Sequence, residues 1–271
     1  MSESIVPQRG IVSFLDILGY ANFLKNNEPE DAAKTVLDVL ATVPKTAVET
    51  LLDLLPDEPM RKYISDRLNQ LRWLVFSDSI LLTCPYPDEA DAEEKRSRWM
   101  VSIISLIIVY RHLLDNGLPV RGAISFGKFF IKDYCFAGRS IIAAHQIALN
   151  LDLAAIAFDD EAVKELKDVD PAAHFTEFKR ILVPYLVPLK GGLSQKMFVL
   201  PPSLERIKFQ NPDIRQIVAE SFWKHNKDIP PNVLDKLDNT ENLLRFMKTK
   251  FPRMFAEKKS APNKSVDGDH Q

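Results

Sequence analysis

The chain has 271 residues, of which 46% are hydrophobic, so it is long enough to bury a sizeable core as one main domain. Its 35 basic residues nearly balance its 37 acidic ones, and without a long basic run we expect no binding to nucleic acid. The two cysteines, Cys84 and Cys135, form no CxxC pair or Cys/His cluster, which argues against a disulfide framework or a zinc site and suits the reducing cytoplasm.

The first residues, MSESIVPQRG, lack the apolar segment of a signal peptide. The most hydrophobic run, Met100–Tyr110, lies between Arg98 and Arg111 and is well short of the ~20 residues of a membrane-spanning helix. We therefore expect a buried helix, no membrane association and a cytoplasmic location.

The first half of the chain alternates short apolar runs with helical patterns. A strand is expected over 11–15, ended by Asp16 and followed by Gly19, and then helices over roughly 20–70 with a break at 54–59. The stretch LVFSDSILLT, residues 74–83, predicts two strands joined by a tight turn. An acidic segment then opens a long helix that runs to Leu114.

The second half repeats this alternation. Residues 120–136 predict two strands that pivot near Gly127, and a helix follows from Gly138, then a short buried strand at 153–158. The pattern divides the chain into three parts, namely a main domain over 1–202, a helical extension over 203–256 packed on the core or on a dimer mate, and a polar, disordered tail over 257–271.

The tight turn within 74–83 carries an acid, Asp78, between two serines. The element order predicts a split βαβ arrangement, in which the strand at 11–15 and the first hairpin strand are parallel and the second hairpin strand lies antiparallel between them. Asp16 and Asp78 would then arrive side by side at one edge of the sheet. Because paired carboxylates repel each other, this arrangement favours a divalent cation, and oxygen ligands favour magnesium or manganese.

Arg121 begins the strand after the long helix, which the same topology brings to that edge, where a guanidinium group can bind phosphate. The turn DILGY adds backbone N–H groups at a helix start. Taken singly, Asp78 is a common turn residue, Asp16 a common helix cap and Arg121 a common surface ion-pair partner. Their coincidence at one edge favours a nucleoside triphosphate site that uses two-metal chemistry.

Five segments carry a family resemblance, and they run in one order along residues 10 to 200. They are FLDILGY (14–20), FSDSILL (76–82), VRGAISFG (120–127), YCFAGRSIIAAHQIA (134–148) and VPLKGGLSQKMFVL (187–200). In this order they resemble the catalytic domain of the class III nucleotide cyclases. Diguanylate cyclases share the core, but FSDS lacks their Gly-Gly-acid signature. The resemblance implies an α+β fold with a ferredoxin-like, palm-type split βαβ core and extra C-terminal helices.

The resemblance also implies roles for individual residues. Asp16, Asp78 and the backbone of Ile17 would hold two divalent cations, Mn²⁺ or Mg²⁺, and Arg121 would bind phosphate from the same chain. In this family the active site lies between two antiparallel domains, so Lys190 would face the polyphosphate from the partner chain of a homodimer. The nucleotide would be surrounded by Phe14, Ile17, Gly19, Leu74 and, from the partner chain, Cys135.

The sequence departs from the family at two positions. Ile142 and Gln146 stand where the family has an asparagine and an arginine that stabilise the transition state. Catalysis could rely more on the metals, or Arg139, one helical turn earlier, could take the cationic part. The alternative is a catalytically silent domain that binds a nucleotide or a protein partner.

The base-reading positions also differ. Cys135 matches the guanylate cyclases of this family, but Leu74 has neither of the polar groups that a purine reader uses. The short chain with these motifs resembles the bacterial pyrimidine cyclases of Pycsar anti-phage defence, which make cyclic UMP or cyclic CMP for a separate effector. We expect UTP as substrate, with CTP, ATP and GTP as alternatives. Cys135 could instead be a packing thiol, and His145 a helix-surface residue.

Overall fold

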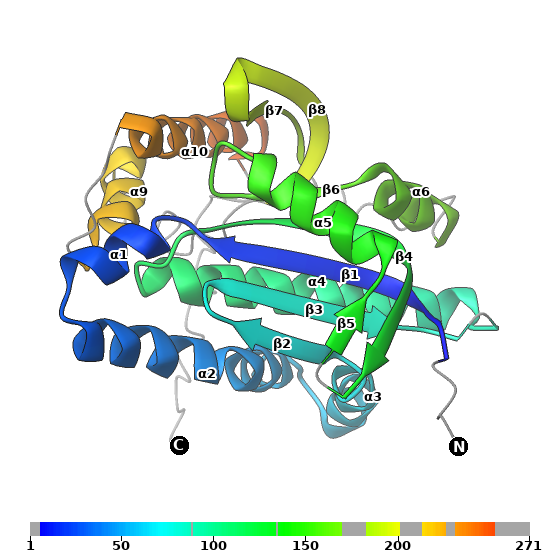
Figure 1. Cartoon of the computed structure of the whole chain (residues 1–271). Helices are drawn as coiled ribbons and strands as arrows, with labels where there is room; N and C mark the ends of the chain where they lie inside the picture. The colour runs from blue at the N-terminus through cyan, green and yellow to red at the C-terminus, as the bar shows by residue number, and fades with distance from the viewer. Residues whose placement is uncertain are drawn as a thin grey trace, which may run out of the picture.

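The computed structural model describes residues 6–87, 89–133, 135–169, 183–200, 213–225 and 231–252. The expected domain boundary at 202 and the expected tail over 257–271 lie outside these residues. A central mixed β-sheet with helices on both faces makes up the core (Figure 1), which confirms the expected α+β class.

The strands are β1 (Gln8–Ile17), β2 (Arg72–Phe76), β3 (Ser79–Pro85), β4 (Val120–Lys132), β5 (Cys135–Ala137), β6 (Ile156–Phe158), β7 (Val183–Leu189) and β8 (Leu193–Leu200). The helices are α1 (Tyr20–Asn26), α2 (Pro29–Asp53), α3 (Glu58–Leu68), α4 (Ala92–Asp115), α5 (Arg139–Asn150), α6 (Asp160–Val169), α9 (Ile214–Trp223) and α10 (Pro231–Lys250). A 3₁₀ turn, η1 (Lys190–Gly192), joins β7 to β8.

The sheet order is β2-β3-β1-β4-β6-β8-β7, and β5 pairs with β4 outside this path. β3 is antiparallel to both β2 and β1, so β1 and β2 run parallel with β3 between them, as the sequence predicts. β4 is antiparallel to β1 and parallel to β6. The ends of β1 and β2 and the starts of β3 and β4 therefore lie at one edge of the sheet.

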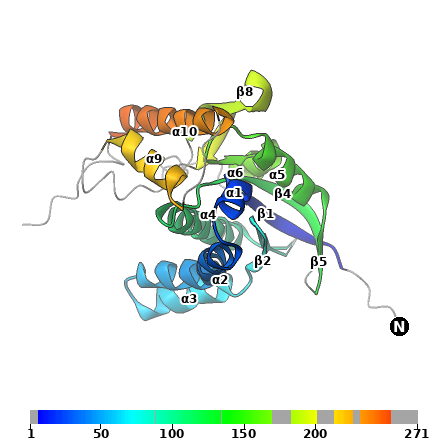
Figure 2. The same cartoon turned by 60° about the vertical axis from the view of Figure 1, so that its left-hand side comes forward.

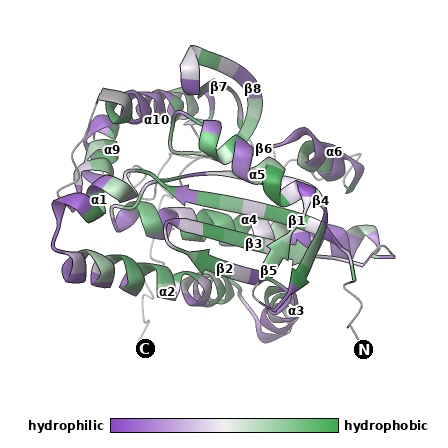
Figure 3. Cartoon of the chain, in the orientation of Figure 1, coloured by the Kyte–Doolittle hydropathy of each residue, from purple (hydrophilic) through white to green (hydrophobic). Residues whose placement is uncertain are grey.

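The central strand β1 is covered on both faces, which explains its nearly continuous apolar sequence. Ile11 and Leu15 pack into a cluster with side chains of α4 and α2, whereas Val12 packs with Ala144 and Ala148 of α5. Figure 1 shows α5 crossing one face of the sheet and α4 lying behind the other. The hydropathy colouring of Figure 3 shows the hydrophobic strands at the centre of these layers.

Helix α4 contains the apolar run Met100–Tyr110. It begins at the N-cap Asp91, whose side chain accepts a hydrogen bond from the backbone N of Glu94 at 2.8 Å. By length and composition α4 could cross a membrane, but most of it is buried within the protein, with Trp99 fully enclosed. The expectation of a buried helix at Met100–Tyr110 is confirmed.

One sequence expectation about the strands is wrong. β4 does not pivot near Gly127 but continues from Val120 to Lys132, and the chain reverses beyond it, where Asp133 has a φ of 54°. The reason is pairing: Gly127 lies opposite Gly10 in the β1–β4 ladder, which holds it in extended conformation. The glycine at this position therefore lies within a strand and marks no turn.

The C-terminal helices α9 and α10 pack beside β7 and β8 (Figure 2). Buried side chains from α10 join a second hydrophobic cluster together with Val187 and Val199 of the sheet. These α10 side chains are Leu237, Leu243, Leu244 and Met247. The described part of the extension is thus attached to the end of the sheet that bears Lys190.

Candidate nucleotide and metal site

The two acids of the sequence motifs lie at the same edge of the sheet. Asp16 is the ninth residue of β1 and pairs in register with Ser79 of β3 and Arg121 of β4. Asp78 lies in the β2–β3 turn, and its carbonyl oxygen accepts a hydrogen bond from the backbone N of Ile17 at 2.9 Å. This backbone contact fixes the Asp78 turn against the end of β1.

Arg121 forms an ion pair with Asp16. Its Nε and Nη2 atoms both lie 2.8 Å from Oδ2 of Asp16, and its Nη1 donates to the carbonyl oxygen of Leu149 at 2.8 Å. Only 11% of the Arg121 side chain and 13% of the Asp16 side chain are exposed. The antiparallel register thus places a guanidinium group opposite Asp16, so the divalent cation expected from the two acids would not be the only positive charge at this edge.

The charges at this edge affect one another. Burial raises the pKa of Asp16, the charge and hydrogen bond of Arg121 lower it, and the nearby charge of Asp78 raises it again. Within the described residues the Asp78 carboxylate makes no hydrogen bond or ion pair. The carboxylates of Asp16 and Asp78 thus face a common region, and only one of them has a strong positive partner.

This donor set fits a hard divalent cation. Asp78 and the second oxygen of Asp16 could serve as carboxylate ligands, and backbone carbonyls and substrate phosphates supply the remaining oxygens of typical magnesium or manganese sites. Among the described residues no group of three or more His, Cys, Asp or Glu side chains gathers for metal binding. Any ion here would therefore depend on phosphate oxygens for part of its coordination.

Lys190 of the same chain also reaches this region. Backbone contacts place the η1 turn beside the end of α5: Leu189 bridges Leu151, and the backbone N of Asp152 donates to Pro188 O at 3.0 Å. Burial lowers the pKa of Lys190, and the charges of Arg121 and Asp16 act on it in opposite directions. The expectation that this lysine comes from a partner chain stays a prediction, and the structure offers a same-chain alternative.

Cys135 and Arg139 lie far from Asp16. The 13 residues of β4 run about 40 Å at about 3.3 Å per residue, and Arg121 lies near one end. Cys135 pairs with Lys132 at the other end, and the start of α5 is held there by a 3.2 Å hydrogen bond from Ser140 Oγ to Lys128 O. Both are exposed, so a second molecule could bring them to the acids.

The departures from the family pattern fall on an exposed face of α5. Ile142, His145 and Gln146 are all exposed, and the His145 ring packs edge-on against Phe14 with 4.9 Å between ring centroids. The expectation that His145 is a surface residue of the helix is therefore confirmed. Phe14 is covered by α5 in the same chain.

The remaining predicted nucleotide contacts are those of the DILGY turn and of Leu74. Gly19 has a φ of 78°, which lets the chain turn from β1 into α1. The N–H groups of Ile17 and Leu18 already bond Asp78 O and Pro119 O, so the DILGY turn has fewer free donors for phosphate than the sequence suggests. Leu74 is half-buried in β2, opposite Leu81 and two residues before the strand ends.

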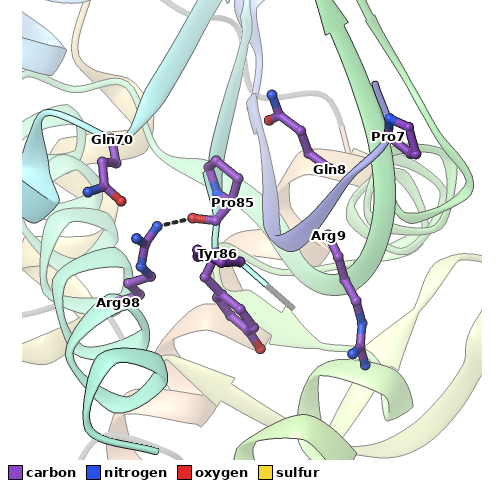
Figure 4. A pocket seen from close by; sticks show the side chains of 8 residues that line it. Pro7, Gln8, Arg9, Gln70, Pro85, Tyr86 and Arg98 are labelled. Atoms are coloured by element: carbon purple, nitrogen blue, oxygen red, sulfur yellow. Dashed lines mark hydrogen bonds between the residues drawn. The ribbon is translucent and has the colours of Figure 1, made fainter. Parts of the chain in front are cut away.

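A separate cavity of about 350 Å³ lies at the opposite edge of the sheet (Figure 4). Gln8 and Arg9 at the start of β1 line it together with Tyr86 and with Arg98, whose guanidinium donates to Pro85 O and pairs with a glutamate. Because β1 begins here and ends at Asp16, the cavity lies outside the candidate site.

Sequence reasoning missed two residues near the site, Asp152 and Lys236, whose side chains pair at 3.1 Å. They are separated by a long stretch of chain and belong to no motif, so no local signal could have paired them. In the structure Lys236 is conspicuous because it is only 8% exposed, and a lysine is seldom buried unless its charge is paired.

No protein-family model and no curated relative matches the chain. Solved structures with some similarity include the monomeric guanylyl cyclase domain of the RhoGC fusion protein from the aquatic fungus Blastocladiella emersonii, at 12% identity and a TM-score of 0.41 over 72% of this chain and 96% of that one. The catalytic core of a rhodopsin-guanylyl cyclase with converted specificity, in complex with ATPαS, aligns at 12% identity with a TM-score of 0.42, over 73% of this chain and 97% of that one. A bacterial light-regulated adenylyl cyclase aligns at 11% identity with a TM-score of 0.42, over 90% of this chain and 59% of that one. Similarities this weak leave the function to be argued from the chain's own residues.

Proposed function

We propose that this protein is a metal-dependent nucleotide cyclase that converts a nucleoside triphosphate to its 3′,5′-cyclic monophosphate and pyrophosphate. One observation carries the proposal: Asp16, Asp78 and Arg121 come from three different segments and meet at one edge of a split βαβ sheet. They are the two acids and the arginine that the motif order of the class III cyclases assigns to metal and phosphate binding.

The reaction forms a bond between the ribose 3′-oxygen and the α-phosphorus and breaks the bond to the β-phosphate. Divalent ions, when bound, would favour the deprotonated 3′-hydroxyl and neutralise the phosphates. Asp16 and Asp78 would hold these ions. Arg121, which has Asp16 as its partner here, and Lys190 would face the leaving pyrophosphate, whose negative charge grows as the bond breaks.

A pyrimidine substrate, UTP before CTP, is supported by the motifs alone. Leu74 offers no hydrogen bond to a purine edge, and the closest motif resemblance is to the pyrimidine cyclases of anti-phage defence. The product would then be a second messenger that a separate effector reads.

A homodimer would complete the site. Along β4, Cys135 lies about 36 Å from Arg121, and the start of α5 with Arg139 lies about 23 Å from it, so both can take part only from a second copy packed antiparallel to the first. The exposed face of α5, which carries Ile142, would lie at that interface.

A catalytically silent nucleotide-binding domain is the second candidate. It is favoured by Ile142 and Gln146, which offer no cation to the transition state, and by the tight pairing of Arg121 with Asp16.

One assay separates the two candidates. Purified protein is incubated with Mn²⁺ or Mg²⁺ and each of the four ribonucleoside triphosphates, and products are identified by chromatography and mass spectrometry. A cyclic monophosphate with equimolar pyrophosphate supports the cyclase, and the preferred triphosphate fixes the base. Nucleotide binding without any product supports the silent domain.

A further inference from the structure

The segment 149–155 connects the candidate site to the C-terminal helix α10. On one side, Leu149 O accepts from Arg121, and Ala155 O accepts from the backbone N of Gly122 at 2.8 Å. The same segment carries the η1 turn through the Leu151–Leu189 bridge. Movement of this segment would therefore shift both cationic groups of the site.

Helix α10 holds the same segment through hydrogen bonds and an ion pair. Asn239 Nδ2 donates to Asp152 O at 2.8 Å, and Thr240 Oγ1 accepts from the backbone N of Ala154 at 2.8 Å. Lys236 Nζ lies 3.1 Å from Asp152 Oδ1, and its side chain is only 10% exposed. Two neutral hydrogen bonds thus hold the backbone, and a mostly buried ion pair adds charge to the same contact.

Four nearby charges act on the ammonium group of Lys190. The carboxylates of Asp16 and Asp152 attract it, whereas Arg121 and Lys236 repel it. The backbone N of Asp152 donates a hydrogen bond to the carbonyl oxygen of Pro188, which is two residues before Lys190, so Asp152 is held close to the η1 turn. Without Lys236, the Asp152 carboxylate would keep, among the described residues, only a 3.4 Å hydrogen bond from Asn239 Nδ2, so it could compete with a bound phosphate for this flexible side chain.

We propose that Lys236 is a positioning residue of the candidate site. By pairing with Asp152, Lys236 keeps that carboxylate from capturing the ammonium group of Lys190. Lys190 then stays available for the phosphates of a bound nucleotide in the same chain as Asp16. The inference deepens the proposed function and rests on it for the identity of the substrate, but phosphate binding can be measured without turnover.

The experiment compares variants of the full chain for binding of inorganic tripolyphosphate with Mn²⁺ by calorimetry. Tripolyphosphate has the charge of the nucleotide's phosphates and no base. Lys236→Met should weaken binding about tenfold, the effect of losing roughly one charge-assisted contact. Lys236→Arg should retain it. The matched control is Lys250→Met, which removes an exposed lysine from the far end of the same helix and should change nothing.

The double variant Lys236→Met/Asp152→Asn gives the sharpest result. It removes the competing carboxylate together with its partner, so binding should return to within about twofold of wild type. For the preferred triphosphate, Lys236→Met should raise KM more than it lowers kcat, and the double variant should reverse this. Melting temperatures show whether each variant is folded, and the double variant leaves no unpaired charge should Lys236→Met alone unfold.

Wild-type binding in Lys236→Met, a double variant no better than Lys236→Met, or a wild type that binds no tripolyphosphate would each overturn the inference. A wild type that binds tripolyphosphate and shows these differences but makes no cyclic nucleotide would refute the cyclase and leave the positioning role intact.

Discussion

Asp16 and Arg121 are register partners across the two central strands, and two nitrogens of the Arg121 guanidinium lie 2.8 Å from a single oxygen of Asp16. Because the pair is mostly buried, removing either group would leave the other as an uncompensated charge with little access to water. Asp78, by contrast, approaches the same point with no hydrogen-bonding partner among the described residues. The two acids of the site therefore differ in what they do for the fold.

This difference predicts opposite effects on stability. Asp78→Ala should abolish turnover and leave the melting temperature within about 2 °C of wild type, because a half-exposed turn side chain is lost. Asp16→Ala should also abolish turnover but cost about 3 kcal/mol of unfolding free energy, because Arg121 is left buried without its partner. Chemical denaturation and product assays measure both. Equal stability losses would show that the ion pair contributes nothing.

Subunit mixing tests which chain supplies Lys190. Asp78→Ala and Lys190→Ala are each expected to be inactive as homodimers. If Lys190 acts on the phosphates of its own chain, where its charge and that of Asp16 already affect each other, a mixture should stay inactive even when differential tags confirm exchanged dimers. A lysine supplied by the partner would instead make one intact site in each mixed dimer and restore about a quarter of wild-type activity with random exchange. Recovery at that level would return Lys190 to the partner's half of the site.

The contact between α2 and α4 should make stability depend on pH. His112 of α4 lies 3.4 Å from Thr42 Oγ1 of α2, and burial lowers its pKa below 6.5 against smaller opposing effects of Val39 and Asp115. The unfolded chain therefore takes up this proton first as pH falls, so the free energy of unfolding should decrease below about pH 6.5 and level off below the folded pKa. Urea titrations of wild type and His112→Gln between pH 7.5 and 5 measure this. A wild-type slope that persists in the variant would assign it to other groups.

The buried hydrogen bond between Tyr86 and Glu165 should stabilise the edge of the sheet far from the acids. Tyr86 is 4% exposed and stacks on Phe126, and the only other hydrogen-bond donor to the Glu165 carboxylate among the described residues is Arg9, at 3.4 Å. Tyr86→Phe should cost about 1–3 kcal/mol, since it leaves a buried carboxylate short of a donor. Tyr185→Phe, which removes a hydroxyl without a described hydrogen bond, is the control. Equal losses in the two variants would refute the role of the bond.

Local patterns in the amino-acid sequence are enough to predict the layout of the core. Strand and helix periods, the break at 54–59 and the tight turn at Asp78 depend on residues close together in the chain, so they predicted the split βαβ order and the meeting of Asp16 with Asp78. Where a local signal was ambiguous the prediction failed: Gly127 suggested a turn, but strand pairing with Gly10 holds it within β4.

Which charges compensate one another depends on contacts between residues far apart in the chain. The Arg121 partner of Asp16 is 105 residues away, and Lys236 lies 84 residues from Asp152, distances over which pairing depends on register and helix docking. The same holds for the position of Lys190, which follows from the bridge between Leu151 and Leu189. Residue types and their spacing indicate which groups can bind metal or phosphate. Long-range packing alone fixes the buried ion pairs, because a charge is tolerated away from water only where packing also brings it a partner.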